Sequence, residues 1–263
     1  MNKKHLCIIP ARMGSSRFPN KPLAKICGIP MIGHIALRAC LEPIFDNVVV
    51  ATCDEEIISY CDSINIKTIL TSNKHERATD RTQEATEKLE NELNIKFDFI
   101  TMLQGDEPMV TPQILKKIVE TLERYNTPIL NLVGKIHDME EFTSKNCVKI
   151  TINNNSEALY FSRSPIPSSL NDKIMPIAYK QFGIIGFERS FLDTYSSLKA
   201  TYLEQIESID MLRCLENNYK IKILTIDNPI FPVDIKEDIL KIEKHFSECK
   251  VFDKYRQKFI YNS

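Results

Sequence analysis

Several familiar signatures are absent from this sequence, and each absence excludes a class of protein. No Gly-x-Gly-x-x-Gly motif follows a predicted strand and no Gly-x-x-x-x-Gly-Lys-Ser/Thr motif occurs, so neither a dinucleotide-binding Rossmann site nor a P-loop is indicated. No apolar run approaches the roughly 20 residues that a helix needs to cross a bilayer. Residues 1–5 lead straight into a predicted strand and leave no room for a signal peptide. We therefore expect no membrane partner and a cytoplasmic location.

An excess of either charge is also absent. The 263 residues contain 34 Lys and Arg and 35 Asp and Glu, so no overall field attracts nucleic acid or an anionic membrane, and we expect no nucleic-acid partner. The eight cysteines include no Cys-x-x-Cys pair, and the five histidines show no metal-ligand spacing. We interpret the cysteines as reduced core residues and the histidines as surface or packing residues.

Strand-like and helix-like segments alternate along the chain. Apolar runs predict strands at residues 6–9, 47–52, 68–70, 97–103, 129–133, 148–152, 182–187 and 221–226. Amphipathic or capped segments predict helices at residues 30–41, 80–93 and 203–215, and after residues 54, 111 and 236. This alternation is typical of an α/β fold with a mixed, mainly parallel sheet flanked by helices.

The domain organisation follows from what does not interrupt the chain. No Gly/Ser-rich linker and no internal repeat divides it. With 43% hydrophobic residues the chain can bury a full core, and we predict a single domain over residues 1–249 with an inserted β-rich lobe at about 130–190. Residues 250–263 form a polar and aromatic C-terminal tail to which the sequence assigns no structure.

The loop that follows the first predicted strand carries three cations, Arg12, Arg17 and Lys21. Open α/β sheets bind their ligands at the carboxyl ends of strands, and the small residues 14–16 let backbone N–H groups approach an anion. Because no P-loop is present, a phosphate site would have to use these side-chain cations. The loop therefore predicts a polyphosphate site. The alternative is a solvated basic loop that is restrained by its prolines.

Two carboxylates from distant parts of the chain follow hydrophobic stretches. Asp106 comes directly after the strand predicted at 97–103, and Asp234 precedes the helix predicted after residue 236. Mg²⁺ typically binds one or two carboxylates together with phosphate oxygens, so we predict that these two residues hold Mg²⁺. The alternatives are an acidic turn at Asp106 and a helix N-cap at Asp234.

A series of short segments resembles those of the 3-deoxy-manno-octulosonate (Kdo) cytidylyltransferases, also called CMP-Kdo synthetases. The segments run in order from about residue 5 to residue 245 and are Ile9–Leu23, Pro30–Ile32, Val50–Thr52, Thr79–Arg81, Gln104–Pro108, Asn146–Lys149, Ala158–Pro167 and Met211–Arg213. The first segment is shared widely among sugar-acid cytidylyltransferases, whereas Ala158–Pro167 is much narrower in its distribution.

The resemblance implies both a fold and a reaction. The fold would be a three-layer nucleotide-diphospho-sugar transferase-like fold whose inserted lobe makes a homodimer. The reaction would transfer CMP from CTP to a 2-keto sugar acid, release pyrophosphate and use Mg²⁺ as cofactor. The CMP-sugar would serve bacterial surface polysaccharide or lipopolysaccharide synthesis. CTP and an acidic sugar are thus the implied partners.

The resemblance also implies roles for individual residues. Catalytic roles fall on Arg12, Lys21 and Asp106, with Asp106 and Asp234 as the Mg²⁺ ligands. The positions implied to bind the nucleotide are Ala11, Arg12, Gly14, Ser15, Lys21, Thr79, Arg81 and Gln104. For the acceptor sugar we predict Arg163 as the partner of its carboxylate, with Gln181 and Asp210 as further contacts. The alternative for Arg163 is a structural ion pair within the lobe.

Several segments depart from the family pattern, mostly on the acceptor side. The family's Ser-Gly-Thr-Asp/Glu-Arg is Arg-Ala-Thr-Asp-Arg at 77–81, and its His-x-Gly-x-Tyr is Gln-Phe-Gly-Ile-Ile at 181–185. Its Glu-Gln pair is Asp-Met at 210–211, and its Gly-Val-Asp-Thr is Pro-Val-Asp-Ile at 232–235. Because hydrogen-bonding groups are lost, we hypothesise a modified Kdo, such as an amino- or deoxy-octulosonate, or another acidic acceptor. Neutral drift around an unchanged substrate is the alternative.

Two other functions remain open at the level of sequence. One is a glycosyltransferase that uses a nucleotide-sugar, although the Asp-x-Asp pair that such enzymes favour is missing at residues 104–107. The other is a non-catalytic nucleotide-binding module, which would have little use for Lys21 together with a complete metal site. The acidic face of the 203–215 helix is interpreted as solvated unless it faces the cleft, where Asp210 would contact the acceptor.

Overall fold

The computed structural model describes residues 3–14, 18–170, 175–227 and 230–260. Residues 258–260 are described through their backbone alone. Ser15 and Arg17, two residues of the predicted polyphosphate loop, lie outside the described residues.

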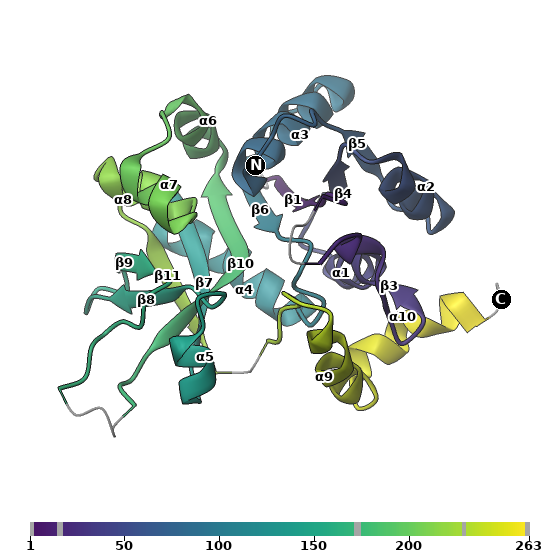
Figure 1. The fold of residues 1–263 in the computed structure, drawn as a ribbon. Helices are drawn as coiled ribbons and strands as arrows, with labels where there is room; N and C mark the ends of the chain where they lie inside the picture. The colour runs from purple at the N-terminus through teal and green to yellow at the C-terminus, as the bar shows by residue number, and fades with distance from the viewer. Residues whose placement is uncertain (1–2, 15–17, 171–174, 228–229, 261–263) are drawn as a thin grey trace.

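Strands and helices alternate through most of the chain (Figure 1). The strands are β1 (His5–Pro10), β2 (Lys25–Ile26), β3 (Ile29–Pro30), β4 (Asn47–Thr52), β5 (Thr68–Leu70), β6 (Phe99–Leu103), β7 (Ile129–Lys135), β8 (Lys149–Ile152), β9 (Ala158–Ser162), β10 (Tyr179–Glu188) and β11 (Lys222–Ile226). The helices are the 3-10 turn η1 (Lys21–Leu23), α1 (Met31–Cys40), α2 (Glu55–Ser63), α3 (Ala78–Leu93), α4 (Pro112–Tyr125), α5 (Met139–Thr143), α6 (Arg189–Ser197), α7 (Tyr202–Glu207), α8 (Met211–Glu216), α9 (Glu237–Phe246) and α10 (Lys250–Ile260).

The central sheet has the strand order β11-β7-β10-β6-β1-β4-β5. Strands β5, β4, β1 and β6 are mutually parallel, β10 is antiparallel to both of its neighbours, and β11 is parallel to β7. The chain adds β4 and β5 on one side of β1 and then returns to add β6 on the other. Ligands bind at such a reversal of strand order, so the carboxyl ends of β1 and β6 are the expected position of a site.

Two hydrophobic cores lie on opposite faces of this sheet, because successive side chains of a strand point in opposite directions. In β1, Cys7 and Ile9 pack into the core that contains α1, α4, α9 and α10. Leu6 and Ile8 pack into the other core, with α3, α6 and α8. The three layers confirm the predicted α/β fold with a mixed, mainly parallel sheet.

The predicted helix at 203–215 is wrong in one respect, because the structure has two helices there. Ser208 ends α7 in the left-handed backbone conformation with φ of 53°, and α8 begins at Met211. The acidic face is not solvated either. Glu204 is fully buried and binds Arg213 through both carboxylate oxygens, at 2.7 and 2.6 Å. The break turns the intervening Asp210 toward α3, where it accepts a hydrogen bond from Thr79.

The predicted lobe region contains β8 and β9, which pair with each other and extend from β10. Strands β7 and β10, at the two borders of that region, belong to the central sheet. The excursion from the sheet is therefore the β8–β9 pair and the segments on either side of it. Whether this part is a separate dimerisation lobe stays a prediction.

The cysteines are free, as the sequence analysis expects, but they do not all belong to the core. Cys27 and Cys40 are exposed, so the interpretation of every cysteine as a core residue is wrong for these two. None of the helices within the described residues is long and apolar enough to cross a membrane.

The C-terminal tail, which the sequence left unassigned, forms α10 and packs beside α1 (Figure 1). The Tyr255 hydroxyl lies 2.7 Å from Nδ1 of His34 and accepts a hydrogen bond from Nε of Arg38 at 3.0 Å. Both partners are fully buried in α1. Arg38 also donates to the Val110 carbonyl and to the Cys249 sulfur, so the tail and the residue before it supply two of the groups that satisfy a buried charge.

The environment of His34 predicts a pH-dependent stability. Burial, followed by the charge of Arg38, lowers the pKa of His34 to about 4 from its ordinary value of 6.5. As the pH falls from about 6.5 to about 4, His34 therefore binds a proton in the unfolded chain but stays neutral in the folded chain. We expect stability to fall in that window by up to about 1.4 kcal/mol per pH unit from this group. In His34→Gln the slope of unfolding free energy against pH should be shallower by one proton.

Urea unfolding at several pH values measures this slope, and His137→Gln, at an exposed position, is the matched control. Equal slopes for the wild type and His34→Gln would contradict the expectation, because His34 would then take up a proton as readily in the folded as in the unfolded chain.

Candidate active site

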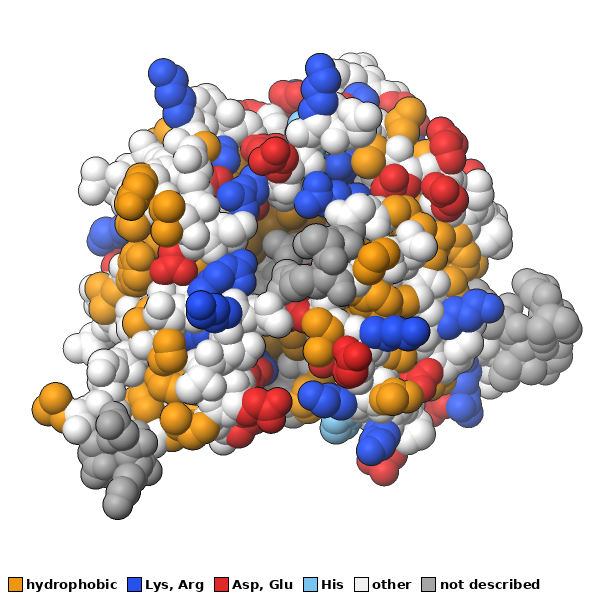
Figure 2. Space-filling view, in the orientation of Figure 1, with side chains coloured by type: hydrophobic (Ala, Val, Ile, Leu, Met, Phe, Trp, Pro, Cys, Tyr) orange, Lys and Arg blue, Asp and Glu red, His pale blue; other side chains and the backbone are white. Residues whose placement is uncertain are grey.

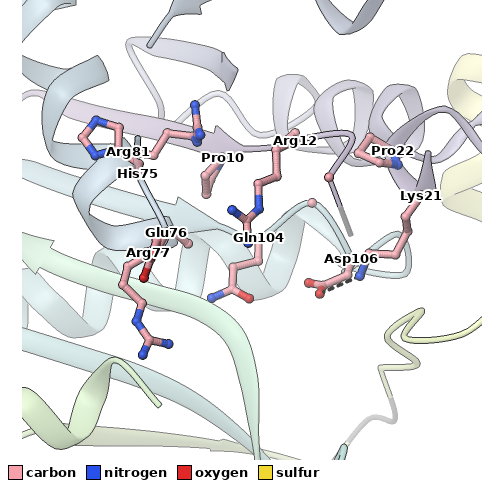
Figure 3. Close-up of a pocket in the computed structure, with 14 residues that line it drawn as sticks. Pro10, Arg12, Lys21, Pro22, His75, Glu76, Arg77, Arg81, Gln104 and Asp106 are labelled. Carbon is pink, nitrogen blue, oxygen red and sulfur yellow. Dashed lines mark hydrogen bonds and ion pairs between the residues drawn. The ribbon is translucent and has the colours of Figure 1, made fainter. Parts of the chain in front are cut away.

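A cavity of about 370 Å³ opens at the carboxyl ends of β1 and β6, where the strand order reverses. Its walls come from the loop after β1, from the segment that leads into α3, and from the turn after β6 (Figure 3). Figure 2 shows a hollow near the middle of this face with Lys and Arg side chains around it. Of the predicted site residues, Ala11, Arg12, Gly14, Lys21, Arg81, Gln104 and Asp106 line the cavity.

The loop after β1 is held by its backbone and leaves its first cation to the cavity. The N–H of Met13 donates to the Asp54 carboxylate at 2.8 Å, and the N–H of Asn20 donates to the Met13 carbonyl at 3.2 Å. Asn20 adopts φ of 60°, a left-handed conformation that asparagine tolerates better than most residues. Arg12 is exposed, and no hydrogen bond or ion pair joins its guanidinium to another residue that the structure describes.

The second cation joins three distant parts of the chain. Nζ of Lys21 donates to Oδ2 of Asp106 at 3.0 Å and to the Val233 carbonyl at 2.9 Å. The N–H of Val233 in turn donates to the backbone carbonyl of Asp106 at 2.9 Å. The segment that carries Asp234 is thereby fastened to the turn that carries Asp106, as a shared metal site would require.

Negative charge accumulates beside this junction. Glu107 is buried, with Oε1 accepting from the N–H of Gly183 at 2.7 Å and Oε2 without a partner among the described residues. Burial, followed by the charges of Asp106 and Asp234, raises the pKa of Glu107 to about 8. The two aspartates thus act on the same buried carboxyl, and a bivalent cation would relieve the repulsion.

The donor set fits Mg²⁺. Within the described residues no three or more His, Cys, Asp or Glu side chains converge in the manner of a closed metal cage. Mg²⁺ does not need one, since it usually takes one or two carboxylates and completes its shell with water and phosphate oxygens. Asp106 and Asp234 are carboxylates of that kind, and their binding of Mg²⁺ stays a prediction.

The N-cap alternative for Asp234 is not what the structure contains. Helix α9 begins at Glu237, and its N-cap residue is Lys236. The backbone N–H groups of Asp234 and Ile235 instead donate to the carboxylate of Asp238, at 2.9 and 3.1 Å. The carboxylate of Asp234 therefore does not cap this helix.

Gln104 lies where a glycine makes room for it. Its N–H donates to the Gly183 carbonyl at 2.8 Å, and a Cβ atom on Gly183 would lie only 2.8 Å from both Cβ and Oε1 of Gln104. Gln181, on the same strand, does not line the cavity. Its side-chain amide donates to Oδ1 of Asn131 at 2.6 Å.

Two predicted nucleotide contacts on α3 have protein partners. Thr79 is buried behind the cavity wall, and its hydroxyl donates to Oδ2 of Asp210 at 3.0 Å. Arg81 is buried as well, and it donates to the hydroxyl of Thr71 and to the sulfur of Cys53 at 3.6 Å. The structure thus brings Thr79 and Asp210 together, although the sequence analysis gives one to the nucleotide and the other to the acceptor.

Arg163 lies outside the cavity lining. Its guanidinium donates to the backbone carbonyls of Glu207 at 2.6 Å, Lys145 at 2.9 Å and Ser208 at 3.2 Å. These contacts fasten the end of β9 to the end of α7. These contacts favour the alternative of a structural role for Arg163, although the acceptors in them are backbone carbonyls and not a carboxylate. Binding of the acceptor by Arg163 stays a prediction.

Four charged or titratable residues at or beside the site were not predicted from the sequence. Arg77, His75 and Glu76 line the cavity, and Glu107 lies beside it. The sequence indicates a surface or packing role for His75, and the contact of its Nε2 with the Glu84 carboxylate agrees with packing, although the residue also lines the cavity. For Arg77 a signal existed, because it falls in the segment 77–81 that departs from the resembled family.

Comparison with known proteins covers the cavity. A family model described as Cytidylyltransferase matches residues 6–223, which include every segment that lines the cavity but not Asp234. The 3-deoxy-manno-octulosonate cytidylyltransferase of Thermodesulfovibrio yellowstonii is 39% identical over 246 residues, or 91% of this chain and 96% of that protein. The 8-amino-3,8-dideoxy-manno-octulosonate cytidylyltransferase of Shewanella baltica is 37% identical over 243 residues, or 91% and 97%.

A solved structure gives the same result for the fold. The structure of CMP:2-keto-3-deoxy-manno-octonic acid synthetase complexed with CTP matches this chain with a TM-score of 0.83 and 33% sequence identity. The match covers 94% of this chain and 99% of the other. The predicted nucleotide-diphospho-sugar transferase-like fold is therefore confirmed.

The close approach of Gly183 to Gln104 predicts that Gly183→Ala is destabilising. The added methyl group must displace the Gln104 side chain or the strand, at a cost of about 1–3 kcal/mol for overpacking. Urea unfolding measures the difference. Gly14→Ala is the matched control, since a Cβ atom there meets nothing within 4 Å. A Gly183→Ala variant as stable as the control would contradict the close packing of these two residues.

Proposed function

Because the chain belongs to the 3-deoxy-manno-octulosonate cytidylyltransferase family, we propose that it transfers CMP from CTP to the anomeric hydroxyl of a 2-keto-3-deoxy sugar acid and releases pyrophosphate. The observation that carries the proposal is the junction at the cavity, where Lys21 contacts both Asp106 and Val233, the neighbour of Asp234. The product would serve the synthesis of bacterial surface polysaccharide such as lipopolysaccharide.

The residues of the cavity suit this reaction without a covalent enzyme intermediate. In-line attack on the α-phosphorus mainly requires that the reactants are positioned and that charge on the phosphate oxygens is neutralised. Arg12, which has no described partner, is available to bind the triphosphate. Lys21 holds an ammonium at the same end, where it would neutralise the departing pyrophosphate. Mg²⁺, when bound by Asp106 and Asp234, would orient the phosphate oxygens and withdraw charge from them.

The acceptor belongs to the Kdo class, and we propose a modified Kdo such as 8-amino-Kdo. Relatives of both specificities resemble the chain to nearly the same extent, at 39% and 37% identity, so overall similarity does not separate them. Support comes from the acceptor-side positions. The amide of Gln181 donates a hydrogen bond to Asn131, and the carboxylate of Asp210 accepts one from Thr79. Both side chains are thus already engaged, and we expect them to bind a sugar hydroxyl less well than unengaged side chains would.

We also propose that the protein is a cytoplasmic homodimer formed through the part that carries β8 and β9. Large apolar side chains are exposed there, with Leu159 at 59% and Ile177 at 69% of their full exposure. Figure 2 shows hydrophobic side chains on the side of the molecule where Figure 1 has these strands. A second copy that covers them would remove apolar area from water.

The acceptor proposal predicts a preference that turnover measurements can detect. Pyrophosphate release from CTP and Mg²⁺ should be at least about 10-fold more efficient in kcat/KM with 8-amino-Kdo than with Kdo, the scale of losing one polar contact. Mass detection of the CMP conjugate identifies the product, and ATP, GTP and UTP serve as controls for the base. Full activity on plain Kdo would contradict the modified acceptor alone, whereas no release with any acidic sugar would contradict the proposed reaction.

The metal proposal predicts the effect of Asp106→Asn. The substitution keeps the shape of the side chain but removes the charge, so kcat should fall at least about 100-fold, the scale of losing one electrostatic contact in a transition state. Calorimetry should detect weaker binding of Mg²⁺ to the CTP complex. Asp253→Asn on α10 is the control, since this exposed carboxylate contacts only Arg256 among the described residues. Unchanged turnover in Asp106→Asn would remove Asp106 from the chemistry.

A further inference from the structure

A guanidinium lies at the end of the cavity opposite Lys21. Arg77 is the N-cap residue of α3, lines the cavity, and has a side chain that is 22% exposed. Figure 3 shows its guanidinium pointing away from Lys21 and Asp106 and extending beyond Gln104. The cavity therefore has a cation at each of these two ends, with the amide of Gln104 and the guanidinium of Arg12 between them. The carboxylate of Glu76 also lines the cavity beside Arg77.

Arg77 is held in this position by α7 and the residues that follow it. Its Nη1 donates to the hydroxyl of Ser208 at 2.9 Å, and its Nη2 reaches the carbonyl of Glu204 at 3.5 Å. The carboxylates of Glu204 and Asp210 each lie 3.6 Å from one of its nitrogens. The turn that breaks the 203–215 segment into two helices is thus what supports the guanidinium.

These carboxylates orient Arg77 without using its donors. Glu204 is bound through both oxygens by Arg213, at 2.7 and 2.6 Å, and Asp210 accepts from Thr79 at 3.0 Å. Burial raises the pKa of Asp210, against the opposing effect of the nearby Arg77 charge, so ionisation of this carboxyl is disfavoured by its surroundings. A guanidinium has five N–H donors, and within the described residues those of Arg77 make two hydrogen bonds.

The other cations near the acceptor side are engaged differently. Arg163 donates to three backbone carbonyls and does not line the cavity. Arg81 is buried and donates to Thr71 and Cys53. Among the described cations at the end away from the triphosphate junction, Arg77 combines a fixed position, unused donors and exposure to the cavity.

We propose that Arg77 is a specificity-determining residue that binds the carboxylate of the acidic acceptor, a role that the sequence analysis gives to Arg163. The inference rests on the proposed function, since it names the contact that would select an acidic acceptor over one without a carboxylate. The planar fork of a guanidinium matches a carboxylate through two parallel hydrogen bonds. Position 77 is also one at which the chain departs from the resembled family, which has serine there.

Steady-state kinetics with Arg77→Ser test the contact. The KM for the acceptor sugar acid should rise at least about 10-fold while the KM for CTP stays within about 2-fold, because only the acceptor loses a partner. Arg77→Lys should recover part of the loss, since the charge remains without the fork. Arg124→Ser, at an exposed arginine of α4 outside the cavity lining, is the matched control.

The methyl ester of the same sugar acid separates binding of the carboxylate from a merely structural effect. In the wild type the acid should be preferred to the ester, and in Arg77→Ser the ratio of their kcat/KM values should fall at least about 10-fold. An unchanged ratio overturns the inference, even if the variant is less active or less stable. A rise in the KM for CTP alone also overturns it, because Arg77 would then contact the nucleotide.

The outcomes distinguish this inference from the function on which it rests. A wild-type protein that releases no pyrophosphate with any acidic sugar overturns both. An active wild type whose Arg77→Ser variant keeps its acceptor KM and its preference for the acid overturns the inference and leaves the proposed function standing. Calorimetric titration with CTP checks that the variant still folds around its nucleotide pocket.

Discussion

The contact of Lys21 with Asp106 and Val233 makes one site from three parts of the chain, since its two partners lie 85 and 212 residues after the lysine. An ammonium between a carboxylate and a carbonyl satisfies groups that would otherwise be crowded acceptors at the end of β6. Because the loop after β1 and the segment before α9 both depend on this contact, the shape of the cavity and its charge are fixed together. The proposed phosphate site and the proposed metal site therefore belong to one arrangement.

The sequence predicted those features that depend on local pattern. Strands β4 and β5 begin and end where the apolar runs do, and in β4 the buried run 49–52 that ends before polar residues leaves little choice of ends. The convergence of Arg12 and Lys21 with Asp106 was also predictable, because each follows a strand and carboxyl ends of parallel strands meet at one edge. Neither prediction required knowledge of which side chains touch.

The features that the sequence did not predict depend on contacts between distant residues. The apolar spacing of 203–215 is the same for one helix as for two, and serine gives no strong signal of the left-handed conformation that Ser208 adopts. The partners of Arg163 are backbone carbonyls, which every residue has, so no pattern of side chains could reveal them. Likewise, the burial of Glu204 follows from Arg213, whose approach only the folded turn creates.

The hydrogen bonds of Tyr255 and Cys249 to Arg38 bear on the order in which the molecule can be completed during translation. Helix α1 leaves the ribosome long before residues 249–255 do, and until they arrive its buried guanidinium lacks two of its acceptors. An unsatisfied charge of this kind is expensive inside a core, so the N-terminal half should remain loosely packed on the nascent chain. Synthesis of the last helix would then be the event that commits the first helix to its final packing.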